Sequence, residues 1–78
     1  YSQCMQRFLD LANSMKEEGA EPRLVSAGLM SASAIYGTYV FAGNEGQMTS
    51  AGVDKMTEAY RQQLDQLQLA KQEKQGTS

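Results

Sequence analysis

One stretch of the chain, LVSAGLMSASAIYGTYVFAG from Leu24 to Gly43, contains no charged residue. Placed at 100° per residue, its apolar side chains spread over almost every side of a helix, and only a strip of small polar residues interrupts them. A helix that is apolar on nearly all sides must be buried on nearly all sides. The pattern therefore predicts a central core helix over residues 22–43.

The segment before this stretch has the pattern of an amphipathic helix. Between Ser2 and Glu18 the apolar residues return every three or four positions, and charged and amide side chains lie opposite them. The apolar stripe covers roughly 120° of the helix and consists of Cys4, Met5, Phe8, Leu11, Ala12 and Met15.

The segment after the stretch predicts a third helix, over residues 51–72. Its apolar seam is narrower, about 80° wide, and is spaced like the edge of a coiled coil. The seam consists of Val53, Met56, Tyr60, Leu64 and Leu67. Both flanking helices are therefore predicted to be half-buried.

Glycine, proline and hydroxyl residues separate the three segments. Gly19 suits the left-handed end of the first helix, and Pro22 suits the first turn of the second. Ser50 is the predicted N-cap of the third helix, with Thr49 as the competing candidate. Residues 75–78 are predicted to fray.

Short connections and chain length decide how these helices assemble. A loop of about three residues makes the first two helices antiparallel, and the third returns along the second. The sequence thus predicts an all-α fold, a three-helix antiparallel bundle forming a single domain over residues 1–74. A chain of 78 residues buries only about 60–65% of its unfolded surface. The lone Cys4 permits no internal disulfide, and without histidine it completes no zinc cage.

Association is the remaining way to stabilise so small a domain. Two outer helices cover two faces of the central helix, and a third apolar face is left. We therefore predict a homodimer joined through the middle helix. The alternative is a self-sufficient monomeric three-helix bundle.

A membrane span is the other reading of the uncharged stretch. Twenty residues are long enough, but the mean hydropathy of roughly 1.3 is below the roughly 1.6 usual for a span. Hydroxyl side chains, with Tyr36 and Tyr39 in mid-helix, lower it. We predict no membrane partner. The net charge of −2 and the scattered basic residues also predict no nucleic-acid partner.

The residues offer little for catalysis. No histidine is present to activate Cys4, which lies on an apolar stripe where cysteine acts as a small hydrophobe. The acidic side chains lie on faces predicted to be solvated, which does not favour a metal site. No phosphate-binding glycine pattern occurs. The sequence predicts no catalytic, metal or cofactor-binding residue and no enzyme.

Four polar residues remain as candidates for contact with a ligand or a partner. Tyr36 and Tyr39 lie on helix faces predicted to be buried, where a phenol needs a hydrogen-bond partner. Asn44 and Glu45 follow the predicted end of the same helix. The alternative interpretation is a capped helix end, in which these side chains satisfy backbone groups.

Several runs of the sequence resemble a known family. RFLDLANSM, VSAGLM, IYGTYVFAGNEG and GVDKMTEAYRQQL occur in the order and spacing of short bacterial proteins, mostly proteobacterial, that are grouped as a domain of unknown function. The resemblance implies a cytoplasmic, all-helical protein and carries no known activity.

Two functional hypotheses follow. The first is a non-enzymatic, dimeric interaction or accessory module that also contacts an unidentified protein. The second is a small-molecule binder with an apolar pocket near Tyr36 and Tyr39.

Overall fold

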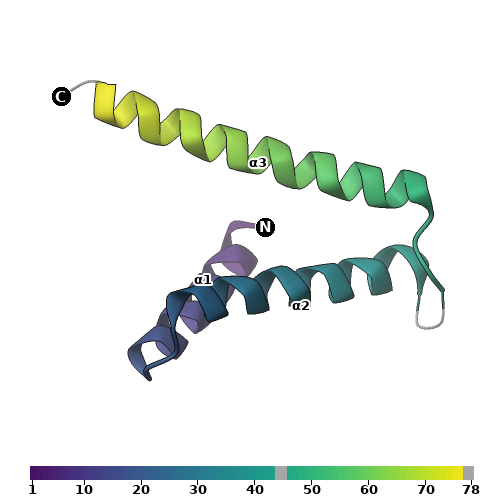
Figure 1. The fold of residues 1–78 in the computed structure, drawn as a ribbon, viewed down its shortest axis with the longest axis horizontal. Coiled ribbons are helices and arrows are strands. Elements are labelled where there is room, and N and C mark those ends of the chain that lie inside the picture. Colours follow the sequence, from purple (N-terminus) through teal and green to yellow (C-terminus); the bar gives the residue numbers. More distant parts are fainter. Residues whose placement is uncertain (44–45, 77–78) are drawn as a thin grey trace. The chain divides into compact units, whose positions relative to one another are not determined.

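The structure is a computed structural model in which residues 1–43 and 46–76 are described, with side chains up to residue 74. Within these ranges the chain forms three α-helices and no strand: α1 (Ser2–Glu17), α2 (Pro22–Ala42) and α3 (Ser50–Gly76) (Figure 1). The prediction of an all-α fold with three helices is confirmed. The chain divides into two compact units, Tyr1–Val40 and Phe41–Ser78, and each is described by itself.

A Schellman turn ends α1. Gly19 adopts a φ of +108°, which suits a residue without a Cβ atom. The amide N–H of Gly19 donates to the carbonyl of Lys16, and that of Ala20 donates to the carbonyl of Met15, both at 3.0 Å. These two bonds satisfy carbonyls that would otherwise be left open at the helix end. The predicted stop at Gly19 is confirmed, with the last helical residue at Glu17 rather than Glu18.

Pro22 is the first residue of α2, as predicted. The carbonyl of Glu21 accepts from the N–H groups of Leu24, at 2.9 Å, and of Val25, at 3.0 Å. Proline costs nothing at this position because the first N–H of a helix has no intrahelical acceptor. The helix ends at Ala42, one residue before the predicted end, and Gly43 follows with a φ of +79°.

Helices α1 and α2 form a hairpin with a tight turn. The chain reverses between Glu18 and Glu21, and the two helices diverge with distance from this turn (Figure 1). Among the described residues only Val25, in the first turns of α2, is buried, at 8% exposure. The hairpin is therefore closed near the turn and open at its other end.

Helix α3 begins one residue earlier than predicted. The hydroxyl of Thr49 accepts from the N–H of Gly52 at 3.1 Å, which is the geometry of an N-cap, and Ser50 is already helical. The preference for Ser50 as the cap was therefore wrong, and the competing candidate Thr49 holds that position.

The same helix also ends later than predicted, at Gly76 rather than residue 72. Gln75 and Gly76, placed in the fraying tail, are helical, while residues 77–78 lie outside the described part. The physical reason is composition, because lysine, glutamine and glutamate are good helix formers and no glycine or proline lies between Gly52 and Gly76.

Candidate interaction surface

One apolar stripe of α2 changes from buried to exposed along its length. Val25, Leu29, Tyr36 and Val40 lie on one face, at spacings of four, seven and four residues. Val25 is 8% exposed and Leu29 is 40% exposed, whereas Tyr36 and Val40 are 69% and 63% exposed. The exposed fraction of the apolar side chains on this face is therefore low near the turn and high far from it.

The facing row of α1 shows the same trend. Ala12 lines the space between the two helices close to the turn and is half-buried. Leu9 and Met5 lie three and seven residues before Ala12, on the same side of α1, and each is 45% exposed. The open end of the hairpin is therefore lined by apolar side chains from both helices, and we call Met5, Leu9, Tyr36 and Val40 the fork.

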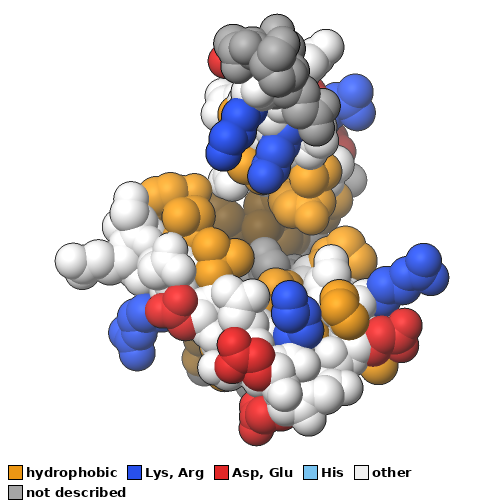
Figure 2. Space-filling view, turned by 90° about the vertical axis from the view of Figure 1, so that its left-hand side faces the viewer, with side chains coloured by type: hydrophobic (Ala, Val, Ile, Leu, Met, Phe, Trp, Pro, Cys, Tyr) orange, Lys and Arg blue, Asp and Glu red, His pale blue; other side chains and the backbone are white. Residues whose placement is uncertain are grey.

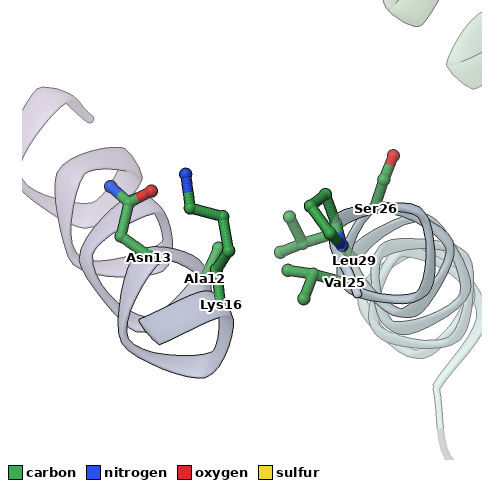
Figure 3. A pocket seen from close by; sticks show the side chains of 7 residues that line it. Ala12, Asn13, Lys16, Val25, Ser26 and Leu29 are labelled. Atoms are coloured by element: carbon green, nitrogen blue, oxygen red, sulfur yellow. The ribbon is translucent and has the colours of Figure 1, made fainter. Parts of the chain in front are cut away.

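A shallow groove lies between the helices at the closed end (Figure 3). In Figure 3, Val25 and Leu29 point from α2 toward α1, while Lys16 supplies the groove's one charged side chain. The groove has a volume of about 200 Å³ and opens to solvent. Its lining residues are Ala12, Asn13, Lys16, Pro22, Val25, Ser26 and Leu29.

Tyr36 and Tyr39 lie near each other on α2, with ring centroids 6.2 Å apart and planes inclined by 41°. Both are exposed, at 69% and 51%, so the expectation that they lie on buried faces is wrong for a single chain. A helix pattern shows which side chains need cover but not whether the same chain supplies it. The other two candidate residues, Asn44 and Glu45, lie outside the described residues.

Helices α1 and α3 also expose their apolar rows. Phe8 and Leu11 of α1 are 58% and 60% exposed, and Tyr60 and Leu67 of α3 are 57% and 56% exposed. Figure 2 shows hydrophobic side chains lying open at the surface among lysine, arginine, aspartate and glutamate side chains. Monomeric soluble proteins rarely leave so much apolar surface uncovered.

Polar chemistry is sparse in the described part of the chain. Cys4 is an exposed free thiol, and no group of three or more metal-binding side chains occurs among the described residues. Arg61 and Asp65 of α3 approach to 3.8 Å, but both are largely solvated, so this pair contributes little stability. The exposed surface is distinguished by its apolar side chains and not by a reactive cluster.

Helix α2 also has the length and composition of a membrane span. The helix has 21 residues, and the mean hydropathy of an 18-residue window within it is 1.3, a value that the core helix of a soluble protein and a signal sequence also reach. It is the only described helix that meets this test. Length and composition therefore do not decide between lipid and protein as the cover for α2.

The comparisons with known proteins identify the family. No curated protein and no solved structure matches the chain. The family described as Protein of unknown function (DUF3144) matches residues 1–74, which is nearly the whole chain. The resemblance to a family defined as a domain of unknown function is thereby confirmed. The chain belongs to the DUF3144 family.

Proposed function

We propose that this protein is a non-enzymatic, cytoplasmic interaction module that works as a homodimer joined through α2. One observation carries the proposal: Val25 is the only buried residue among those described, although α2 is apolar on nearly all sides. A helix of that character is stable in water only when other apolar surface covers it. A single chain supplies that cover at one position.

Charge favours a second copy of α2 as the cover. No charged residue lies between Leu24 and Gly43, so two such helices meet without desolvating a charge. A two-fold interface uses the same patch on both copies, so the patch must be self-complementary. The uncharged surface of α2 meets that requirement.

The alternative function, a small-molecule pocket near Tyr36 and Tyr39, receives no comparable support. The groove described between α1 and α2 lies near the turn, and none of its lining residues is a tyrosine. It is also open and small, whereas ligand pockets usually enclose about 300–1,000 Å³.

Sedimentation equilibrium from 1 to 100 µM, in buffer without detergent, tests the proposal. We expect a species of twice the 8.6 kDa chain mass at the higher concentrations. A mass of one chain at every concentration would overturn it. So would a monomer that floats with phosphatidylcholine vesicles, because lipid rather than protein would then cover α2.

A further inference from the structure

Resting on the proposed homodimer, we propose that the two copies close each other's forks. The C-terminal half of α2 from one copy docks between the diverging ends of α1 and α2 of the other. Tyr36 and Val40 of each copy then contact Met5 and Leu9 of its partner. The interface is thereby assigned to one end and one face of α2.

The gradient of exposure along the α2 stripe locates the interface. At the closed end α1 covers Val25, and the same face is 69% exposed at Tyr36 and 63% exposed at Val40. Any partner that completes this stripe must therefore contact its far end. Because the stripe is continuous, the partner extends a packing layer that the hairpin has already begun.

The divergence of the two helices makes the fork accessible to another helix. Figure 1 shows α1 and α2 separating with distance from the turn, which leaves Met5 and Leu9 exposed on the side that Ala12 occupies closer in. Side chains on two diverging helices present apolar surface from two directions. A helix that enters between them is covered on both sides, as α2 requires.

The composition of the fork selects a second copy of α2 as the occupant. None of the four fork side chains is charged, and the C-terminal half of α2 carries no charge to place against them. Tyr36 and Tyr39 suit such an interface, because an aromatic ring buries a large apolar area and its hydroxyl group can remain at a polar edge.

Two matched lysine variants test the assignment. Val40 and Leu24 are similarly exposed, at 63% and 68%, but they lie about 160° apart around α2. We expect Val40→Lys to raise the dimer Kd about 100-fold or more, because each dimer then buries two unpaired charges. Leu24→Lys is expected to change it less than about 3-fold.

The helix dipole alone would make Leu24→Lys more destabilising than Val40→Lys, which is the opposite of the expected order. A lysine near the C-terminus of α2 is favoured by the dipole, and one near its N-terminus is disfavoured. A larger loss from Val40→Lys therefore cannot come from helix-end electrostatics. Equal loss from both variants, or loss from Leu24→Lys alone, overturns the assignment to the fork. A wild-type chain that is monomeric overturns the proposed function itself.

Crosslinking provides a second test that does not depend on a measured dissociation constant. In a Cys4→Ser background, chains carrying Leu9→Cys are refolded together with chains carrying Val40→Cys and treated with a short bismaleimide. We expect a link between positions 9 and 40, which must join different copies because each chain has one cysteine. Replacing the second chain with one carrying Leu24→Cys is expected to abolish the link. A dimer that forms no 9–40 link, or links 9 to 24 equally well, contradicts the proposal.

Discussion

Val25 and Val40 are the same amino acid on the same face of the same helix, yet their environments are opposite. Val25 faces α1 near the turn and is 8% exposed, whereas Val40 is 63% exposed at the diverging end. The difference comes from the distance of each residue from the turn. Local sequence thus decides that both valines need cover, and the geometry of the hairpin decides which one receives it.

The comparison separates two sources of stability. At the closed end a hydrogen-bonded turn and one buried side chain hold the hairpin within a single chain. At the open end the apolar surface stabilises the protein only when something outside the hairpin covers it. Substitutions at the two ends should therefore differ in size and in their dependence on protein concentration.

The largest effect is expected from Val25→Asp. An unpaired carboxylate at the buried position should cost about 3–5 kcal/mol, which is as much as the core of so small a domain usually supplies. Urea unfolding followed by far-UV circular dichroism should then show no cooperative transition. Leu24→Asp is the control, because it adds the same charge at the neighbouring exposed position and should keep the transition. If Val25→Asp kept the wild-type transition, burial at the closed end would not stabilise the hairpin.

A change of protein concentration should have the next largest effect. For a two-state dimer, a 100-fold increase stabilises the folded form by about 2.7 kcal/mol per mole of dimer. The thermal midpoint of the wild-type chain should therefore rise between 5 µM and 500 µM, as measured by circular dichroism. A midpoint that stays constant means that the fork is covered within one chain or not at all.

A smaller effect is expected at the turn itself. Gly19→Ala places a Cβ atom at a φ of +108°, and an L-residue in left-handed backbone costs about 1–2 kcal/mol. Urea titration should show this loss. Glu18→Ala is the matched control, because that residue already has right-handed helical angles, with a φ of −77°. Equal stability of the two variants would show that the Schellman turn does not hold the closed end.

The smallest effect, and one of opposite sign, is expected from Gly28→Ala. Apart from the adjoining residues and the backbone of α2 itself, no atom of the described residues lies within 4 Å of where a Cβ at Gly28 would be, and alanine is favoured over glycine in a helix by up to about 1 kcal/mol. If the partner docks at the fork, this position stays free and the variant gains stability in urea titration. A loss instead would place a closely packed helix against the Gly28 side of α2.

Sequence alone predicted the helix ends where one residue dictates the backbone. Gly19 and Pro22 act through their own backbone geometry, so the ends they mark were placed to within one residue. The ends of α3 were harder. Thr49 and Ser50 are chemically equivalent caps, and no breaker stops the helix before Gly76.

Burial could not be predicted with the same success. The pattern showed that Tyr36 and Tyr39 need apolar surroundings, and it predicted that they lie on buried faces. They are exposed because the hairpin diverges before it reaches them, and no periodic pattern encodes that divergence. The fork was missed for the same reason, although Leu9 is an apolar residue beside the predicted stripe of α1.

The Schellman turn has a consequence for the order of assembly. It joins α1 and α2 through hydrogen bonds between residues three and five positions apart, so the hairpin closes by contacts that are near in sequence. Such local contacts form quickly, whereas subunit association depends on encounters between chains. We therefore expect refolding from urea to show a fast phase that dilution leaves unchanged, followed by a bimolecular phase that dilution slows.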